Sequence, residues 1–272
     1  MEELEMVAAE ARRTSRASFL RTGAVAGAGM AAASLLPGSA LAALKGETAS
    51  LTAGDVSILS AAAIAEALAV TTYSNIIDTA PFFKNLENDD KGYLVAAREE
   101  EMSHYLLEAG ATKKQSPYTV FYYPKGMFQD AKTTLNTLVT LEDAFIAAYL
   151  VGVRNFSTAD LRVTAARIMG IESDHRTLAR VVGPGVAKSD GGPVEAITGV
   201  LGKAESVDPP NNNGYERTLK WTSINQAVTA LTPFIDKTAA GKAGFDTSKA
   251  YTFHPFTPKL PNALGAFHSF AG

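Results

Sequence analysis

The chain has 272 residues, of which 46% are hydrophobic, so it can bury a sizeable core as one large domain or two small ones. Its formal net charge of −3 gives no electrostatic reason to expect nucleic acid as a partner. Because the sequence contains no cysteine, disulfides, thiolate zinc sites, iron–sulfur clusters and cysteine nucleophiles are excluded, and any metal must be bound by oxygen and nitrogen.

Residues 1–43 have the composition of an export signal. A polar, arginine-containing start is followed by a Gly- and Ala-rich apolar run, Thr22 to Leu36, and Ala42 closes an A-x-A cleavage pattern. A retained membrane anchor fits less well, because the run has only about 15 residues and a spanning helix needs about 20. We therefore predict an exported protein, periplasmic, in the cell envelope or extracellular, with no membrane span in the mature chain.

The run SRASFLR, Ser15 to Arg21, resembles a twin-arginine export signal, although Ala17 stands where the second arginine is expected. On this resemblance the sequence favours the twin-arginine route over the general secretory route. Beyond the signal, we expect a helical domain over residues 50–240 and an irregular tail over residues 241–272.

The first helix of the domain is predicted over Asp55 to Asp78, because apolar residues recur there every three or four positions. Glu66 falls on this apolar stripe and is the only formally charged side chain between Val56 and Ile77. Pro81 is expected to end the helix. Since an isolated carboxylate in an apolar bundle is costly unless a cation or hydrogen bonds compensate it, Glu66 is a candidate metal ligand.

The second helix is predicted from about Asn88 to Ala109, with Gly110 as its C-terminal end signal. Glu101 and His104 stand three residues apart in it, so both side chains project from one face. They occupy the inner stripe, where apolar residues are usual. Glu108 follows one turn after His104 and is interpreted as a supporting or surface group rather than a ligand.

No helical period is found between Gly110 and Phe128, a stretch rich in Tyr, Phe and Pro. Roughly 18 extended residues at ~3.3 Å each reach well beyond the ~30 Å length of a 20-residue helix. The second and third helices can therefore run parallel, joined by one long crossover. The sequence leaves open whether this stretch contains a short β-hairpin.

The third helix, from about Gln129 to Asn155, carries Glu142 on its apolar stripe, and the neighbouring Asp143 is a rival ligand. We prefer Glu142, because it lies on the stripe and its longer side chain can bridge two metal ions.

The fourth helix is expected to begin near Ser157 or Thr158, either of which can act as its N-cap, and its apolar stripe extends to Val182. Glu172 and His175 repeat on this stripe the Glu-x-x-His spacing of the second helix. The pair is therefore offered twice, from two different helices.

The C-terminal third is less regular, with one short helix expected from Val194 to Ala204. A fifth helix is predicted over Tyr215 to Ile235; its apolar face is mixed, so we expect it to pack across the bundle rather than build the site. The aromatic and proline-rich tail from Thr252 either lies over the bundle or contacts a neighbouring subunit, which leaves a homo-oligomer open. His254 and His268 lack a carboxylate at ligand spacing and are interpreted as surface or packing residues.

One Glu from each of two helices and one Glu-x-x-His from each of two others is the ligand set of carboxylate-bridged di-iron and di-manganese bundles. The six candidate metal ligands are Glu66, Glu101, His104, Glu142, Glu172 and His175. With these residues in this order, the chain resembles the ferritin-like superfamily, and more closely its exported branch, which includes the plant desiccation-related proteins. The resemblance covers Asp55 to Val182 and, more loosely, Asn211 to Phe234.

The resemblance implies an all-α fold: a ferritin-like four-helix bundle with a long crossover between helices two and three, a fifth C-terminal helix and an irregular tail. It implies two iron ions, or alternatively manganese, with Glu101 and Glu172 as bridges, Glu66 and Glu142 as outer carboxylates, and one histidine per metal. The expected partners are therefore metal ions together with O2 or peroxide.

Two functions follow as hypotheses. The first is a redox-active dinuclear centre, ferroxidase-like or catalase-like, that oxidises Fe(II) or acts on O2 or peroxide. The alternative is a stress- or desiccation-related structural protein, whose polar core could be closed by carboxylate–histidine hydrogen bonds without metal. Tyr73 and Tyr149, two turns from Glu66 and Glu142, are interpreted as core residues rather than redox partners.

Overall fold

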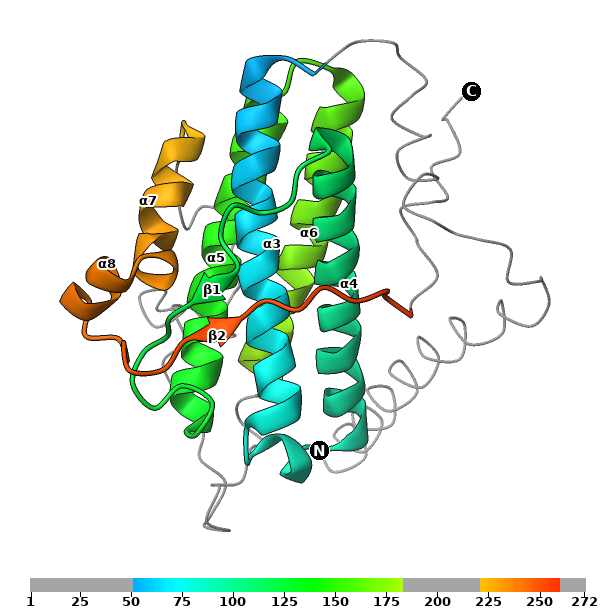
Figure 1. The fold of residues 1–272 in the computed structure, drawn as a ribbon. Coiled ribbons are helices and arrows are strands. Elements are labelled where there is room, and N and C mark those ends of the chain that lie inside the picture. The colour runs from blue at the N-terminus through cyan, green and yellow to red at the C-terminus, as the bar shows by residue number, and fades with distance from the viewer. Residues whose placement is uncertain (1–50, 183–220, 260–272) are drawn as a thin grey trace, which may run out of the picture. The chain divides into compact units, whose positions relative to one another are not determined.

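Residues 51–182 and 221–259 are described by the computed structural model. Four long helices form a bundle in this part of the chain (Figure 1). They are α3 (Ala53–Thr79), α4 (Asn88–Thr112), α5 (Ala131–Asn155) and α6 (Ala159–Val182). The predicted helical bundle is confirmed, whereas the expected signal over residues 1–43 and the short helix over residues 194–204 lie outside the described residues.

The helix α3 begins at a capping box. Thr52 Oγ1 accepts a hydrogen bond from Asp55 N (3.1 Å), and the Asp55 carboxylate accepts one from Thr52 N (2.8 Å). The helix ends at Thr79, because Ala80 is extended (ψ 122°) in front of Pro81, as predicted. Packing against α4 and α5 buries most of its length, which places Glu66 in the interior.

The helix α4 extends three residues beyond its predicted end at Ala109, to Thr112. It continues through Gly110 and ends at Lys113, whose φ of 56° lies in the left-handed region. The expectation that Gly110 ends this helix is therefore wrong. The last turn is held by tertiary packing, since Ala111 still packs against the apolar cluster that contains Leu107.

The chain from α4 to α5 is the predicted long crossover. It returns along the bundle, so that α4 and α5 run parallel (Figure 1). It contains the strand β1 (Val120–Phe121), which pairs antiparallel with β2 (Tyr251–Thr252) in the register Val120 opposite Thr252. The strand partner therefore comes from the C-terminal segment, and the crossover does not form a hairpin of its own.

The turn between α5 and α6 shows which of the two candidates, Ser157 or Thr158, is the N-cap of α6. Thr158 Oγ1 accepts a hydrogen bond from Leu161 N (3.2 Å), so Thr158 caps α6. Ser157 instead donates from its backbone N (2.9 Å) and its hydroxyl (2.6 Å) to the Asp55 carboxylate. The start of α3 is thereby tied to the start of α6.

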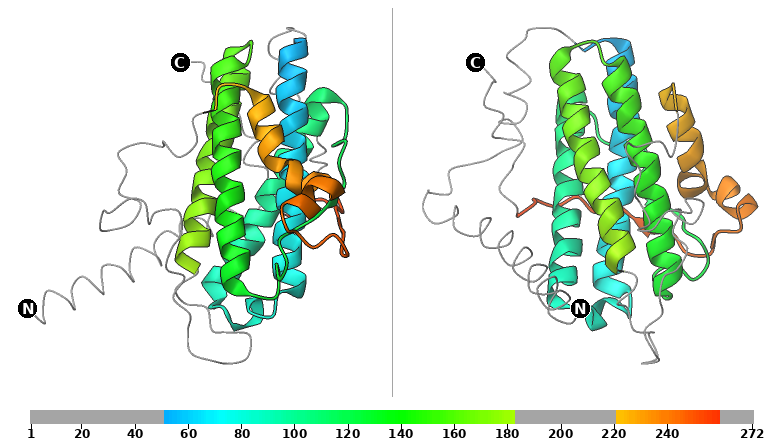
Figure 2. Two further views of the ribbon diagram at one scale, coloured as in Figure 1. Left: turned by 90° about the vertical axis from the view of Figure 1, so that its left-hand side faces the viewer. Right: turned by 180° about the vertical axis from the view of Figure 1, so that it is seen from behind.

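Two shorter helices follow, α7 (Ile224–Ile235) and α8 (Lys237–Lys242). As predicted, α7 packs across the bundle, against α3 and α5, and supplies no candidate ligand (Figure 2). Its start differs from the prediction, because a capping box of Ser223 with Gln226 begins the helix and residues 221–223 are not helical. The rest of the predicted span, residues 215–220, lies outside the described residues, and α8 was not predicted.

The segment after β2 crosses the outside of α4 (Figure 1). The rings of Phe253 and Tyr105 meet edge to face with their centroids 4.7 Å apart, and Lys259 N donates to Glu99 Oε2 (2.6 Å). Up to residue 259, the tail thus lies over the bundle, which was one of the two open alternatives.

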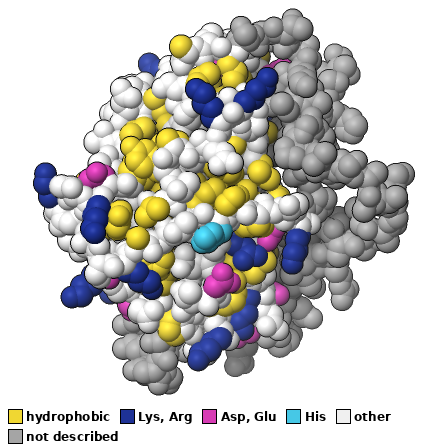
Figure 3. Space-filling view, in the orientation of Figure 1, with side chains coloured by type: hydrophobic (Ala, Val, Ile, Leu, Met, Phe, Trp, Pro, Cys, Tyr) yellow, Lys and Arg dark blue, Asp and Glu magenta, His cyan; other side chains and the backbone are white. Residues whose placement is uncertain are grey.

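Length and hydropathy alone would allow α3 and α5 to cross a membrane. In each helix 72% of the apolar window is buried inside the structure, so the bundle itself covers most of this surface. On the face shown in Figure 3, basic and acidic side chains are interspersed among apolar ones.

Candidate metal centre

Six titratable side chains from the four long helices meet in the bundle interior. They are Glu66 on α3, Glu101 and His104 on α4, Glu142 on α5, and Glu172 and His175 on α6. None is more than 3% exposed. The fold thus brings together all six side chains that the sequence analysis singled out.

These side chains form two groups of four. Each group offers one atom per residue, and these atoms lie within 4.8 Å of one another. The groups are Glu66, Glu101, His104 and Glu172, and Glu101, Glu142, Glu172 and His175. Because Glu101 and Glu172 occur in both groups, they lie where carboxylates that bridge two ions are found in such bundles.

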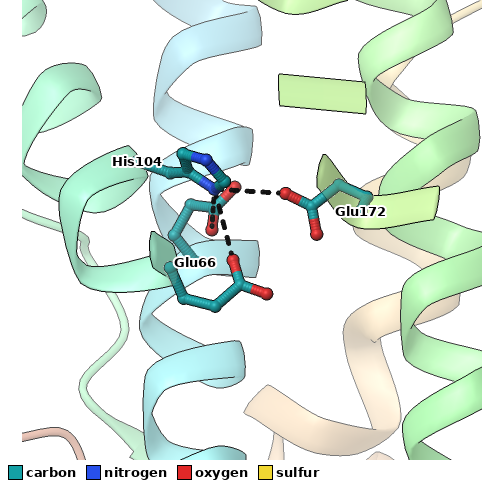
Figure 4. A group of neighbouring side chains, drawn as sticks. Glu66, His104 and Glu172 are labelled. Carbon is teal, nitrogen blue, oxygen red and sulfur yellow. Dashed lines mark ion pairs between the residues drawn. The ribbon is translucent and has the colours of Figure 1, made fainter. Parts of the chain in front are cut away.

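His104 is surrounded by carboxylates of three helices. Its Nδ1 lies 3.2 Å from Glu172 Oε1, 3.4 Å from Glu101 Oε2 and 3.6 Å from Glu66 Oε2. Figure 4 shows the carboxylates of Glu66 and Glu172 pointing toward the imidazole of His104, each from its own helix. A nitrogen and three oxygens therefore converge on one small volume.

His175 occupies the corresponding place in the second group. Its Nδ1 lies 2.9 Å from Glu101 Oε1 and 3.6 Å from Glu172 Oε2. Its other ring nitrogen, Nε2, lies 2.9 Å from Glu100 Oε2. A carboxylate on the outer nitrogen of a ligating histidine fixes its tautomer and ring orientation. Sequence reasoning missed Glu100, because neighbours on one helix do not share a face and only the approach of α6 brings His175 to it.

Several of the oxygen and nitrogen atoms that could bind a metal are buried and have no hydrogen-bond partner. They are Glu66 Oε2, Glu101 Oε2, His104 Nδ1, Glu142 Oε2 and both Glu172 oxygens. Leaving buried polar atoms unpaired is costly, and native proteins usually satisfy them. Converging oxygen and nitrogen atoms are ligands that metal ions take, so these residues fit a metal site.

Protonation compensates these charges in the protein without metal. Burial raises the pKa of Glu66 and Glu142 well above the ordinary value, and neighbouring carboxylates raise it further. Burial acts in the same direction on Glu101, but the charge of His175 and the hydrogen bonds from Glu66, His104 and His175 together outweigh it, so the pKa of Glu101 is lowered. Burial opposes the charged form of His104 and His175, yet the surrounding carboxylates raise the pKa of both. Metal binding must therefore displace protons.

Two tyrosines connect the outer carboxylates across the bundle. The Tyr73 hydroxyl on α3 donates to Glu142 Oε1 on α5 (2.7 Å), and the Tyr149 hydroxyl on α5 contacts Glu66 Oε1 on α3. Each tyrosine follows the glutamate of its own helix by seven residues and bonds to the glutamate of the other helix. These buried tyrosines are thus core residues, as interpreted, and they also hold the candidate ligands in place.

Glu108 on α4 has no counterpart on α6, so the surroundings of the two Glu-x-x-His pairs differ. It is 1% exposed, and its Oε1 lies 2.6 Å from the Tyr149 hydroxyl. The residue at the corresponding position after His175 is Ala179. Glu108 therefore supports the site through Tyr149, and the surface interpretation is wrong, because α4 turns this residue inward.

Asp143, the rival of Glu142, points elsewhere. Its Oδ1 accepts a hydrogen bond from Arg176 Nη1 (2.7 Å), and both side chains are buried. It belongs to neither four-residue group. Of the other histidines, His254 is exposed and His268 lies outside the described residues.

Comparison with known proteins agrees with this architecture. Residues 54–183 match the family model described as a ferritin-like domain. No curated protein and no solved structure matches the chain. The four long helices with their buried Glu and His side chains therefore form a ferritin-like domain.

Proposed function

We propose that this ferritin-like domain binds two transition-metal ions, iron or manganese. The proposed ligands of one ion are Glu66, Glu101, His104 and Glu172, and those of the other are Glu101, Glu142, Glu172 and His175. The observation that carries the proposal is that the two groups share two carboxylates while each has one histidine of its own.

The proposed activity is redox chemistry with O2 or peroxide. A bound pair of iron or manganese ions would supply it, because two metals can together exchange two electrons with one oxidant. The four carboxylates supply the negative charge that stabilises higher oxidation states. Tyr73 and Tyr149 keep the outer carboxylates oriented, and the apolar helices around them exclude bulk water.

Metal stoichiometry tests the binding proposal. Protein loaded with Fe(II) or Mn(II) and freed of excess metal should contain two ions per chain by elemental analysis. Glu101→Gln should lose most of both ions, because Glu101 belongs to both groups. Glu99→Gln is the matched control. Glu99 lies on the same helix and is also buried, but it belongs to neither group, and its carboxylate accepts a hydrogen bond from Lys259 N. Wild-type protein that retains less than one ion per chain would contradict the proposal.

Oxidant consumption tests the redox proposal. Fe(II)-loaded wild type should consume O2 or H2O2 faster than the same amount of free Fe(II). Glu66→Ala should lose this excess while keeping its helical circular dichroism spectrum, because only one ligand is removed. If wild type and Glu66→Ala both match free iron, the redox proposal fails.

A metal-free structural role is the second candidate, and the hydrogen bonds between helices in the site are the observation that supports it. Tyr73, Tyr149 and His175 each bond to a carboxylate of another helix, so they can hold the interior together without an ion. This role, as in a stress- or desiccation-related protein, predicts no retained metal and a wild type as stable after chelation as before.

We further propose that the protein is exported, on the composition of residues 1–43. Protein recovered from the periplasm or the medium should begin near Ala43. An intact mass that corresponds to the full-length chain would contradict cleavage.

A further inference from the structure

An apolar cavity lies beside the candidate metal centre. Its volume is about 20 Å3, and it lies at the end of the bundle where α3 and α6 begin and α4 and α5 end. Its walls are mainly apolar side chains, among them Leu107, Phe145, Ala165 and Ile168. Several of these belong to a buried apolar cluster that is separate from the main core of the bundle.

Tyr149 connects this cavity with the candidate ligands. Tyr149 lines the cavity, and its hydroxyl contacts Glu66 Oε1. Glu108 also lines the cavity, and its Oε2 is buried without a hydrogen-bond partner. A molecule held in the cavity would therefore be separated from Glu66 only by the side chain of Tyr149.

The size and polarity of the cavity limit what it can hold. A volume of about 20 Å3 exceeds the roughly 10–15 Å3 that one water-sized molecule needs. A water also needs two to four polar partners, and the polar side chains on the wall are Glu108, Tyr149 and Thr164. The Tyr149 hydroxyl and one Glu108 oxygen are already bonded to each other.

The charge of the wall favours an apolar occupant as well. Burial raises the pKa of Glu108, which disfavours a negative charge on this wall. A small, uncharged, apolar molecule loses little on leaving water for such a cavity. Dioxygen has this size and polarity.

We propose that this cavity holds dioxygen beside the metal centre and delivers it to the side of the site formed by Glu66 and His104. The inference rests on the proposed redox function and specifies its oxidant as a small apolar molecule. The cavity itself can be probed without metal, so the two proposals can fail separately.

Xenon is the probe for the cavity, because it is apolar and visible by its anomalous scattering. Crystals of the metal-free wild type kept under xenon should show a xenon atom between Leu107, Ala165 and Tyr149. Ala165→Val should abolish this peak by filling the space, and Leu107→Ala should increase its occupancy. Ala80→Val is the matched control; Ala80 is also buried, but it follows α3 at the other end of the bundle and has an extended backbone that suits valine.

Kinetics with dioxygen then test delivery. In Fe(II)-loaded protein, Ala165→Val should raise the KM for O2 several-fold, with little change in kcat at saturating O2, whereas Ala80→Val should leave both unchanged. Should Ala165→Val fold poorly, Leu107→Ala provides the second test, since a larger cavity should not raise the KM for O2.

Three results would overturn the inference. They are the absence of xenon from the wild-type cavity, an ordered water on Glu108 that xenon does not displace, and an unchanged KM for O2 in Ala165→Val despite loss of the xenon peak. If the loaded wild type consumes no O2 beyond free iron, the redox function fails and the delivery role fails with it. The xenon experiment would still decide separately whether the cavity takes up an apolar gas.

Discussion

The Tyr149 hydroxyl has one hydrogen but lies against two carboxyl groups, those of Glu66 and Glu108. It can donate to only one of them at a time. The other contact is a hydrogen bond only if that carboxyl group is protonated and donates to the Tyr149 oxygen. Burial raises the pKa of both Glu66 and Glu108, in agreement with a proton held here. In the described part of the chain, the Tyr73 hydroxyl bonds to one carboxyl group, that of Glu142, and does not impose this requirement.

We therefore predict that the two tyrosines differ in their contribution to stability. In the metal-free protein, Tyr149→Phe should lower the free energy of unfolding by about 1–3 kcal/mol, because two buried carboxyl groups lose a partner. Tyr73→Phe, the matched control in the other half of the site, should lower it by less. Urea denaturation of both variants measures the difference, and equal losses would mean that Glu108 does not depend on Tyr149.

At the scale of elements, Asp55 joins two helix starts. Its carboxylate accepts hydrogen bonds from Thr52 in the cap of α3 and from Ser157 in the turn before α6. Burial alone would raise the pKa of Asp55, but the bonds from Ser157 and Thr52 outweigh it and lower the pKa. The ionised form is therefore favoured by folding.

Asp55→Ala should lower the free energy of unfolding at neutral pH by about 1–2 kcal/mol, the upper part of the range for the loss of a helix cap, because the bonds to both Thr52 and Ser157 are lost. Because the pKa is lowered in the folded state, this stabilisation is present above the unfolded pKa of about 4 and is lost as pH falls through the folded value. The difference between wild type and variant should thus shrink in acid.

The control for this prediction is Asp130→Ala, at the cap of α5. Asp130 accepts hydrogen bonds only from its own helix start among the bonds that the described residues show, so its loss should cost less, about 1 kcal/mol. Thermal denaturation at several pH values measures both variants. An Asp55→Ala cost that equals the Asp130→Ala cost would show that the bonds to Ser157 add nothing.

For the whole molecule, the buried site makes stability depend on protons when metal is absent. The pKa of Glu66 and Glu142 is raised in the folded state, so folding favours their protonated form above about pH 4, where the unfolded chain releases these protons. The pKa of His104 and His175 is also raised, so folding favours their protonated form as well. Stability of the metal-free fold therefore falls as pH rises through these folded-state pKa values. A pair of cations would supply the compensation that the lost protons supplied.

Chelated protein should accordingly lose thermal stability as pH rises above the ordinary histidine pKa of about 6.5, while metal-loaded protein should lose much less. The increase in Tm on adding Mn(II) should grow with pH. Glu66→Gln should weaken the pH dependence of the chelated protein, because one titrating carboxyl is gone. A Tm increase that is the same at every pH would contradict the exchange of metal for protons.

The spacing of residues already identified the four long helices and the inward-facing Glu and His side chains, because helical geometry relates sequence distance directly to direction. Glu66, as the only charge in an apolar helix, and the two Glu-x-x-His pairs could be found in this way. End signals were weaker: Pro81 ended α3 as predicted, whereas Gly110 did not end α4, since packing around Ala111 extends the helix.

The tertiary structure alone decided the contacts between segments that are distant in the chain. It paired β1 with a strand more than a hundred residues away, brought Glu100 to His175, and set Tyr149 between Glu66 and Glu108. The sequence determined the helices and the face on which each candidate ligand lies, because local geometry fixes both. Which atoms meet across that face depends on how the helices pack against one another, and no spacing within one helix encodes this.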